Sequence, residues 1–565
     1  MKKITAILLA LVLALGLLAG CSSESSAASA APAESTVQPE PAPEPVAEED
    51  SAETVSEPAD AVPSAEEAAE ETPVEDAYVL PLTTGGETLT MFAITNSNVT
   101  DNIGDLGNHQ IYVQAEKVTG VNVEIQAVMQ EVSSDQFSLI IASGDWPDMV
   151  RSANYPAGLS SAYEEEIVID MADYLEYAPN YAKILEENPN IAKEAKTDDG
   201  NILEMYYLNS YNGAFEVPLL EGPVIRGDLL DALELEVPTT VDELYDVLTQ
   251  FKAAYDLADP LFMSNNAFGA GSFLMGAFDA SAELYQVDGT VKFGPMEDGF
   301  KAYLETMTKW YSEGILNSDF YNYDENPMSP VTEGKKTGGD VGVFNAPAAN
   351  LGAYCSDTVT YVGMPILPNK EGKNHFITTI TLDTSKGMTI TTTCSNIALA
   401  MAWCDFWYSE PGRLLSNYGI EGVTFAYDEN GVPHWTDLLL NNSDGLSVGI
   451  ARQCYVTLTQ QPGVCPKEIE VSLLDDNALA AVEIWGRVGD ADYDMPNVSL
   501  TSEESSRAAQ IFSDLDTLSQ ETWYKILMGQ ADISTWGEYL SQMESMGVQE
   551  YIDIYQTALD RYNDR

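Results

Sequence analysis

The sequence predicts an α/β protein with two lobes, each a mainly parallel sheet flanked by helices. Three observations carry this prediction. Residues 89–150 alternate between strand-like and helix-like patterns of apolar residues. About 490 residues follow position 77, which is too many for one hydrophobic core and enough for two large lobes. Hydrophobic residues make up 45% of the chain and aromatic residues 9%, which is typical of a globular protein.

The chain begins with an export signal. MKKITAILLALVLALGLLAGC carries two lysines and then one apolar run, which predicts a signal peptide over residues 1–20. The motif LAGC resembles the lipobox of bacterial lipoproteins, in which the peptide is cut before the cysteine and the thiol receives a diacylglyceryl group. The resemblance implies that Cys21 is lipidated and anchors the protein to the membrane without spanning it. The alternative is an ordinary secretory signal with an incidental cysteine.

Residues 21–77 predict a disordered acidic tether. The segment consists mainly of Ala, Pro, Glu, Ser and Thr, and there is no Lys or Arg between Lys3 and Lys117. Such a composition buries too little apolar surface to offset the entropy of ordering the chain. A flexible coil of this length reaches roughly 40 Å, and proline and self-repulsion extend it further. We expect it to act as a spacer that holds the folded body away from the membrane.

The charge of the chain excludes nucleic acid as a partner. The formal net charge is −65, whereas nucleic-acid binding needs clustered Lys and Arg. A polyanionic ligand such as a uronic-acid oligomer is also disfavoured, unless Arg151 or Arg226 overrides the field locally. Isolated arginines such as these two are more often surface or ion-pair residues.

Cysteine and histidine usage predicts no metal and no cofactor. Five cysteines follow Cys21, without a C-x-x-C motif, and the three histidines have no partner at metal-ligand spacing. Cys454 and Cys465 could close a loop in an oxidising environment or remain buried thiols. The segments 198–201 and 428–431 resemble calcium loops but lack the alternating oxygen ligands of an EF-hand, so we interpret both as turns.

The first part of the folded body reads as strand, helix, strand. LTMFAI predicts a strand, residues 101–119 predict a helix that stops at Gly120, and VNVEIQAV alternates as a strand does. The apolar run FSLIIAS predicts another strand. Ligands of parallel α/β sheets bind at the carboxyl ends of strands, which here are followed by residues 95–98 and 144–148.

Helices are predicted further along the chain. Thr240 and Glu243 are spaced as a capping box before an apolar stripe, Leu244, Val247, Leu248 and Phe251. Ser395 opens a second helix that ends at Pro411-Gly412. The C-terminal stretch repeats the pattern through Trp536, Leu540 and Met543, and after Gly547 through Tyr551, Tyr555 and Leu559.

Six blocks of sequence, in order along the body, are similar to family 1 extracellular solute-binding proteins. They are QAEKVTGVNVEIQAV with FSLIIASGDWPDMV, MADYLEYAPNYAKILEENPNIAKEAKTDDGNI, GPVIRGDLLDALELEVPTTVDELYDVLTQFKAAYD, VKFGPMEDGFKAYLETMTKWYSEGILNSDF, FWYSEPGRLLSNYGIEGVTFAYDENG and ILMGQADISTWGEYLSQMESMGVQEYIDIYQTALDRYN. They resemble the LplA-related lipoproteins of Gram-positive bacteria, which are substrate receptors of ABC importers and are usually associated with oligosaccharide uptake.

The resemblance implies a type II periplasmic-binding-protein-like fold that traps its ligand by lobe closure. We expect one lobe from residues 78–209 and 388–440, and the other from 210–387 and 441–565. Hinges are expected near 208–213, 386–393 and 440–449. The implied receptor is a monomer on the outer face of the cell membrane, it serves ABC permease subunits, and it catalyses no reaction. A ligand-presenting sensor, a peptide-binding lipoprotein and a secreted glycoside hydrolase are the alternatives.

Sugar binding favours aromatic rings for stacking and planar polar side chains for hydroxyl groups, and the chain has 8 Trp and 29 Tyr. We selected residues in predicted loops, each of which could equally well only pack or lie exposed. The predicted ligand-binding residues are Trp146, Asp148, Asn96, Asn98, Tyr211, Phe278, Phe344, Asn345, Tyr418, Glu421 and Trp435, with Trp146 the foremost.

Overall fold

The computed structural model describes residues 79–152, 155, 158–215, 217–264, 273–322, 338–376, 382–429, 431–456, 462–486 and 492–565. Chain contacts divide the molecule after Pro73, and every described residue belongs to the unit Val74–Arg565. The predicted signal peptide, Cys21 and the predicted tether lie outside the described residues. Within the described part, no helix is long and apolar enough to cross a membrane.

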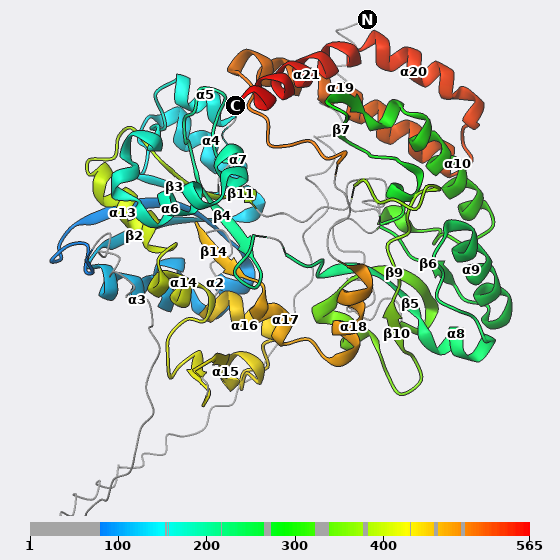
Figure 1. Cartoon of the computed structure of the whole chain (residues 1–565), viewed down its shortest axis with the longest axis horizontal. Helices are drawn as coiled ribbons and strands as arrows, with labels where there is room; N and C mark the ends of the chain where they lie inside the picture. The colour runs from blue at the N-terminus through cyan, green and yellow to red at the C-terminus, as the bar shows by residue number, and fades with distance from the viewer. Residues whose placement is uncertain are drawn as a thin grey trace, which may run out of the picture. The chain divides into compact units, whose positions relative to one another are not determined.

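The first sheet has six strands in the order β14-β4-β11-β3-β1-β2 (Figure 1). Their bounds are β1 Thr88–Thr95, β2 Asn122–Met129, β3 Met149–Arg151, β4 Met205–Ser210, β11 Leu382–Ile390 and β14 Gly463–Pro466. Strand β11 is antiparallel to both of its neighbours, and the other adjacent pairs are parallel. Five of these six strands therefore run in one direction, as a mainly parallel sheet requires.

Alternating residues of β1 build the two sides of this sheet. Leu89 and Met91 enter a large core on one side, whereas Phe92 packs on the other side with Phe137 and Val150. The helices around the sheet are α2 Ser97–Ile103, α3 Gln110–Thr119, α4 Ser133–Ser143, α5 Leu159–Glu164, α6 Pro179–Glu187, α7 Pro189–Glu194, α13 Ile397–Phe406, α14 Glu410–Asn417, α15 Asp437–Leu440, α16 Val448–Tyr455 and α17 Glu468–Ser472, with the hairpin β12 Phe425–Tyr427 and β13 Pro433–Trp435.

The second sheet has four strands in the order β10-β5-β9-β6. Their bounds are β5 Glu221–Arg226, β6 Asp259–Leu261, β9 Val341–Pro347 and β10 Tyr361–Gly363, and β5 runs opposite to the other three. Val224 and Ile225 of β5 enter separate cores on the two faces. The surrounding elements are α8 Gly227–Leu233, α9 Val241–Tyr255, α10 Asp298–Ser312, α12 Leu351–Tyr354, α18 Asp476–Trp485, α19 Ser502–Leu527, α20 Trp536–Ser545 and α21 Val548–Asp564, with the hairpin β7 Leu284–Val287 and β8 Thr290–Phe293.

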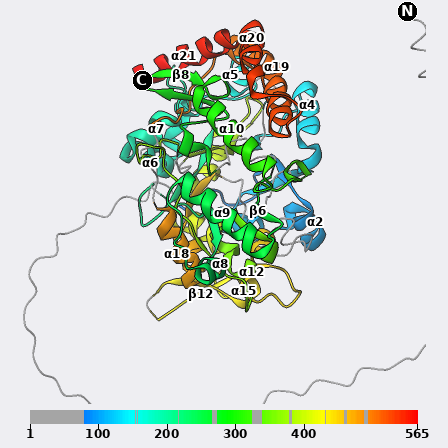
Figure 2. The same ribbon diagram turned by 90° about the vertical axis from the view of Figure 1, so that its right-hand side faces the viewer.

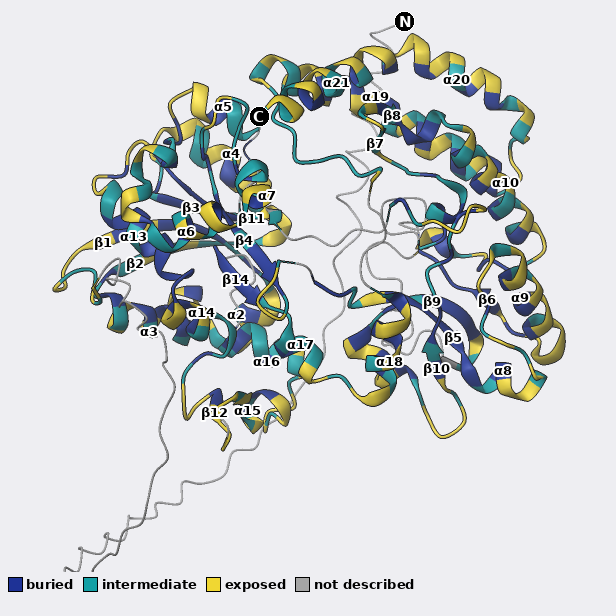
Figure 3. Ribbon diagram, viewed as in Figure 1, coloured by how far each residue is buried: buried dark blue, intermediate teal, exposed yellow. Residues whose placement is uncertain are grey.

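Helices α9, α19 and α20 are amphipathic, with their buried stripes turned to the core. In Figure 3 the exposed faces of α9, α19 and α20 are separated from buried faces along each helix. Helices α8, α9 and α10, at the right in Figure 1, face the viewer in Figure 2. Buried Phe300 of α10, Trp523 of α19 and Trp536 of α20 belong to one core with α9. This core anchors the C-terminal helices to the second sheet.

Several predicted elements are confirmed. LTMFAI lies in β1 and VNVEIQAV in β2, the two strands pair in parallel, and the helix before β2 ends at Gly120 with φ 76°. Thr240 caps α9 by accepting a hydrogen bond from the Glu243 amide. The stripe Leu244, Val247, Leu248 and Phe251 is buried as predicted. The C-terminal apolar stripes form α20 and α21.

The strand predicted at FSLIIAS is wrong. These residues lie in helix α4, which ends at left-handed Gly144 with φ 73°. A short apolar run is compatible with a strand or a helix, and local sequence does not separate them. A second boundary is also wrong, because Pro411 lies in the first turn of α14 rather than ending α13. Proline fits there because the first turn has no use for its missing N–H.

The predicted lobe boundaries differ from the strand pairing. Strand β14, residues 463–466, pairs with β4 in the first sheet, although this segment was assigned to the second lobe. Strand β11 belongs to the first sheet from Leu382 rather than from 388. We therefore define the first lobe as described residues 79–215 and 382–472, and the second lobe as 217–376 and 476–565.

Two of the three expected hinges are also wrong. Residues 386–390 lie inside β11, and residues 440–449 run from the last residue of α15 into the first turn of α16, within the first lobe. The described chain passes between the sheets after β4, between β10 and β11, and between α17 and α18. Only the first of these passages coincides with an expected hinge, at 208–213.

Candidate ligand-binding site

The carboxyl ends of five strands define one edge of the first sheet. Asn96 follows β1, Ser152 follows β3, Tyr211 follows β4 and Lys467 follows β14. The reversed strand β11 begins at this edge with Leu382. Ligands of open α/β sheets bind at this edge, because loops there are free to vary while the strands hold them in place. We call it the carboxyl edge.

Three amide side chains meet at the carboxyl edge. Asn96 caps α2 by accepting a hydrogen bond from the Val99 amide at 3.2 Å. The Nδ2 atoms of Asn96 and Asn98 lie 3.3 and 3.5 Å from Oε1 of Gln453, on α16. Asn98 is exposed, and the other two amides are half-buried. Amide groups donate and accept hydrogen bonds in one plane, which is the chemistry needed to recognise sugar hydroxyl groups. We call these three residues the amide cluster.

A buried histidine connects the amide cluster to α3. His109 Nε2 lies 3.0 Å from the Gln453 carbonyl oxygen, and its Nδ1 accepts a hydrogen bond from the Ile111 amide. These contacts fit a neutral ring with the proton on Nε2. Burial lowers the pKa of His109 to about 4, the bond to Gln453 opposes this, and the charge of Arg151 adds to it. The ring is therefore uncharged at neutral pH.

Arg151 is the last residue of β3, which lies next to β1 in the sheet. It is 3% exposed, its Nη1 donates to the Tyr112 hydroxyl at 2.5 Å, and its Nη2 donates to the Ile94 carbonyl at 2.9 Å. Its Nε is buried and has no hydrogen-bond partner among the described residues. The guanidinium thus connects β1 to α3.

A second polar group follows β4. The Asn212 amide donates to Oε1 of Glu468 on α17, and Oε2 of Glu468 is buried without a partner among the described residues. At the start of β11, Lys386 Nζ lies 2.7 Å from Asp383 Oδ2. Burial opposes ionisation of Asp383, but hydrogen bonds from Lys386 and Ser385 lower its pKa overall. These side chains offer charged hydrogen-bonding partners beside β4 and β11, which lie three and two strands away from β1 in the sheet.

In the second sheet, a polar pair lies near the carboxyl end of β9. Asn345 Nδ2 donates to Glu221 Oε1 at 2.6 Å, and burial raises the pKa of Glu221 against the effect of that bond. Asn345 lies inside β9 rather than after it. Its neighbour Phe344 was also predicted to contact ligand, but it is fully buried against Tyr354 and Tyr361. Phe344 is therefore a core residue of the second lobe.

Trp146 and Asp148 do not lie where the sequence argument placed them. Both precede β3, and Asp148 Oδ2 accepts hydrogen bonds from the Thr90 amide at 2.7 Å and the Thr90 hydroxyl at 2.8 Å. Because β1 and β3 are parallel, these contacts are at the amino edge of the sheet. The Trp146 indole packs in the core around Phe137 and donates to the Ile141 carbonyl at 3.0 Å. The reasoning that put them after a strand is wrong, because both residues precede β3 and lie at the edge opposite the carboxyl edge.

The remaining predicted residues have mixed surroundings. Trp435 is 7% exposed and packs under Arg452, with 4.8 Å between the guanidinium carbon and the ring centroid. Phe278 packs edge-to-face on Tyr303, and Tyr418 packs against Phe425. Glu421 is exposed, and Tyr211 is half-buried in a tight turn with Ala214. Of these residues, Tyr211 lies at the carboxyl edge.

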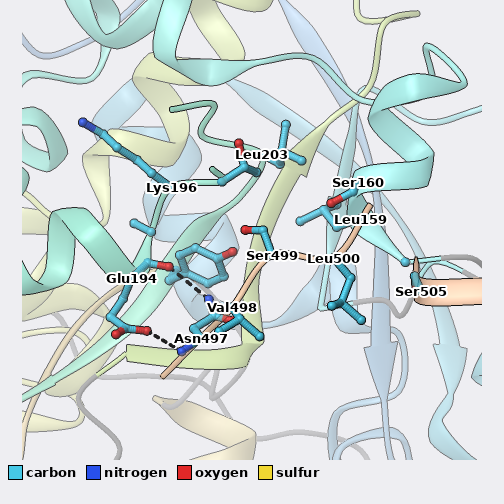
Figure 4. A pocket seen from close by; sticks show the side chains of 14 residues that line it. Leu159, Ser160, Glu194, Lys196, Leu203, Asn497, Val498, Ser499, Leu500 and Ser505 are labelled. Atoms are coloured by element: carbon cyan, nitrogen blue, oxygen red, sulfur yellow. Dashed lines mark hydrogen bonds between the residues drawn. The ribbon is translucent and has the colours of Figure 1, made fainter. Parts of the chain in front are cut away.

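A cavity of about 230 Å³ lies elsewhere, near the amino end of β4 (Figure 4). There the backbone N–H of Asn497 donates to Oε2 of Glu194 at 2.9 Å, and its side-chain Nδ2 donates to the Glu194 carbonyl oxygen at 3.0 Å. The cavity contains none of the predicted ligand-binding residues. Its lining comes from Gly158, Leu159, Ser160, Glu194, Ala195, Lys196, Thr197, Leu203, Tyr206, Asn497, Val498, Ser499, Leu500 and Ser505.

Sequence reasoning missed Gln453 and the surroundings of Arg151. Gln453 is separated by 357 positions from Asn96, and nothing in its local sequence distinguishes it from any other helical glutamine. Arg151 was noted only as one of two arginines. No group of three or more His, Cys, Asp or Glu side chains among the described residues could hold a metal ion, and the five described cysteines are free thiols.

Residues 107–413 match the family model described as bacterial extracellular solute-binding protein. The chain belongs to this family. The chain is 23% identical over 487 residues to the fructooligosaccharide ABC transporter substrate-binding protein FusA of Streptococcus pneumoniae, which covers 80% of this chain and 87% of that protein. It is 26% identical over 475 residues to the polygalacturonan/rhamnogalacturonan-binding protein YtcQ of Bacillus subtilis, covering 79% and 87% respectively.

Solved structures agree with this assignment at the level of the fold. The alginate-binding protein AlgQ2, solved without calcium ion, superposes with a TM-score of 0.68 at 23% identity, covering 85% of this chain and 99% of AlgQ2. The two-lobe α/β fold that the sequence predicted is thus confirmed.

Proposed function

We propose that this protein is a membrane-anchored extracellular receptor that captures an oligosaccharide as a monomer and delivers it to an ABC permease. The observation that carries the proposal is the match to sugar-binding relatives along four-fifths of the chain. The amide cluster supports it, because planar amides at the carboxyl edge are suited to sugar hydroxyl groups. Capture then requires the ligand to contact both lobes, since a ligand shifts the population only toward a state that it binds better.

The proposed binding surface uses Asn96, Asn98, Gln453 and Tyr211 of the first lobe. The candidate partners in the second lobe are Asn345, near the carboxyl end of β9, and Glu221, at the start of β5. Trp146, Asp148, Phe344 and Trp435 are not used, because each is engaged in packing or in hydrogen bonds within its own lobe.

Thermal-shift screening against neutral and uronic oligosaccharides, followed by calorimetry, tests the capture step. We expect at least one oligosaccharide to raise the melting temperature, and Gln453→Ala to weaken its binding about tenfold or more. Gln250→Ala is the matched control, because Gln250 lies on the exposed face of α9 and bonds only within its helix. Equal affinity of Gln453→Ala and wild type would remove the amide cluster from the site.

Two further measurements test the rest of the proposal. Mass spectrometry of the bound sugar should show it unchanged, and cleavage at a rate proportional to protein concentration would indicate an enzyme instead. Cys21→Ala should abolish incorporation of labelled lipid and release the protein from membranes. Equal labelling of mutant and wild type would contradict the lipid anchor.

A further inference from the structure

The two lobes contact each other along a seam near the amino end of β4. We define the seam by residues 193–198 of the first lobe and by residues 497–504 and 561–565 of the second lobe (Figure 1). Across it, the Asn497 amide donates to a Glu194 carboxylate oxygen at 2.9 Å, and Asn497 Nδ2 donates to the Glu194 carbonyl oxygen at 3.0 Å (Figure 4). The lobes are therefore joined by hydrogen bonds as well as by the passages of chain between them.

Two guanidinium groups of the second lobe bind one carboxylate of the first lobe. Arg561 Nε donates to Asp198 Oδ2 at 2.6 Å, and Arg565 donates to Asp198 Oδ1 through Nε at 2.9 Å and through Nη2 at 2.6 Å. The Nη1 and Nη2 groups of Arg561 also bind Glu504 of α19, at 2.9 and 2.7 Å. The chain has only 25 Lys and Arg against 90 Asp and Glu, so two arginines at one carboxylate concentrate a scarce charge at the seam.

Arg565 fills a niche that is lined by oxygen atoms. Besides binding Asp198, it donates through Nη1 to the carbonyl oxygens of Lys193, at 3.0 Å, and Lys196, and through Nη2 to Ser499 Oγ at 2.7 Å. The Arg565 side chain is 8% exposed. Carboxylate and carbonyl oxygens are also the atoms that bind a calcium ion. The guanidinium therefore lies where a metal ion would find suitable ligand atoms.

Asp198 also opens the segment 198–201, which resembles a calcium loop in sequence. The structure shows a turn there, in which the Gly200 amide donates to the Thr197 carbonyl oxygen and Gly200 has φ 86°. Both oxygens of Asp198 accept hydrogen bonds from guanidinium groups, and Asp199 is exposed. These residues do not fit a calcium ion, because two arginines already neutralise the carboxylate and the described part of the chain has no group of three acidic, histidine or cysteine ligands.

The seam and the passages of chain lie at opposite edges of the first sheet. The chain leaves the first lobe after β4 and after α17, which follows β14, and it returns at the start of β11, all at the carboxyl edge. Helix α21 is fixed to the second lobe by Val548 and Tyr551, which are buried in its core. Movement of the lobes about the passages therefore pulls the end of α21 away from residues 193–198 and breaks the bonds to Asp198.

We propose that Arg561 and Arg565 form a clasp that holds the two lobes together without a metal ion and before a ligand arrives. The inference goes beyond the proposed function, because it concerns the protein without ligand. Bidentate pairs of arginine and carboxylate are strong charge-assisted hydrogen bonds, and removing one partner leaves the other charge uncompensated. The clasp shifts the population of the ligand-free protein toward the joined state, so that a ligand has less of the closure to drive.

Small-angle X-ray scattering and amide hydrogen exchange of the whole chain, both without ligand, test the clasp. In the variant carrying Arg561→Gln and Arg565→Gln, we expect a larger radius of gyration than wild type and about tenfold or more faster exchange in residues 193–198. Arg561→Lys with Arg565→Lys should lie between, because lysine keeps the charge but loses the two-pronged contact. Arg565→Gln alone is measured in the same way in case the double variant does not fold. Scattering and exchange identical to wild type in the glutamine variants would overturn the proposal.

Arg507→Gln is the matched control. Arg507 binds both carboxylate oxygens of Glu550 at 2.6 Å and joins α19 to α21 inside the second lobe. Its loss removes an equally short pair from α21 without changing the seam, so scattering and the exchange of residues 193–198 should match wild type. A control variant that opens the seam as far as the glutamine variants would show that any weakening of α21 suffices, and it would overturn the assignment to Arg561 and Arg565.

Calcium and EDTA distinguish the clasp from a metal site. We expect wild type to have the same melting temperature and scattering in calcium, in an equal concentration of magnesium and in EDTA, because guanidinium groups already bind both oxygens of Asp198. A melting temperature that is higher in calcium than in magnesium, and that EDTA lowers, would overturn the metal-independent clasp. None of these measurements uses a sugar, so their outcome is independent of the oligosaccharide screen.

Discussion

Replacing Trp146 by alanine should destabilise the first lobe and leave ligand affinity nearly unchanged. The indole packs in the core formed by Phe92, Phe137 and Val150, and its Nε1 donates to the Ile141 carbonyl at 3.0 Å. It lies at the amino edge of the sheet, whereas the proposed site is at the carboxyl edge. The substitution therefore removes packing and one hydrogen bond at a distance from the proposed ligand.

The size of the effect follows from this environment. Trp→Ala in a fully buried site costs about 3–5 kcal/mol, and the half-buried indole should account for about 2 kcal/mol of this. Loss of the hydrogen bond to Ile141 adds about 1 kcal/mol. For a lobe-sized domain, a total of about 3 kcal/mol lowers the melting temperature by about 6–12 °C. Trp146→Phe keeps most of the packing and should lose about 1 kcal/mol, mainly the hydrogen bond.

Both quantities are measured on the same protein, by calorimetric melting without ligand and by titration with the sugar found in the screen. We expect affinity to stay within about threefold of wild type, which is under 1 kcal/mol. An aromatic ring that stacks on the sugar would behave differently, since its removal typically costs about 2 kcal/mol of binding, or about thirtyfold. A thirtyfold loss of affinity with an unchanged melting temperature would refute the packing argument and return Trp146 to the site.

Three other predictions probe the structure. The pKa of His109 in the folded protein, about 4, is below its ordinary value of 6.5, so the stability that neutral His109 contributes is complete above pH 6.5 and is lost toward pH 4. Over that pH range, urea unfolding should show wild type losing about 3 kcal/mol of stability relative to His109→Gln. Parallel pH profiles of the two proteins would contradict this. Gly412→Ala should cost about 3 kcal/mol or more of stability, because the added Cβ would meet the backbone carbonyl oxygen of Phe406 at 1.8 Å. The control Gly449→Ala, in open space on α16, should be neutral or stabilising by about 1 kcal/mol. Equal melting temperatures of the two variants would show that the backbone near Gly412 shifts to make room. Asp198→Asn should weaken the ion pairs of Asp198 with Arg561 of α21 and with Arg565, which follows that helix, and should cost about 2 kcal/mol. The loss is detected as faster proteolysis of the C-terminal helix, and unchanged proteolysis would mean that these pairs contribute little.

Much of the fold was accessible from local patterns. The parallel pair β1 and β2, the capped helix α9 and the C-terminal helices were predicted because their apolar residues repeat at the period of the element over many residues. The seven residues FSLIIAS are too short to distinguish the two periods, and this one error moved Trp146 and Asp148 to the wrong edge of the sheet. The lobe boundary failed for a different reason, because β14 pairs with β4 across more than 250 residues of chain.

The candidate site was predictable only in part. Asn96 and Asn98 were found because polar residues follow a clear strand, and the structure places them at the carboxyl edge. Gln453 was missed because it lies on a helix that local sequence cannot assign to the same edge. Phe344 was selected among residues of predicted loops, but it lies inside β9 and is fully buried, so a core residue was taken for an exposed one.

The sequence by itself determined the α/β class and pointed to the family, and it predicts an export signal and a tether, because each depends on composition or on patterns continuous along the chain. The tertiary structure decided which edge of the sheet each loop occupies, which buried arginine has no carboxylate partner among the described residues, and which aromatic rings are already packed. These properties depend on side chains brought together from distant positions, such as Arg151 with Tyr112 and Asn96 with Gln453. Their energies arise from burial and pairing, which a linear sequence does not contain until the chain has folded.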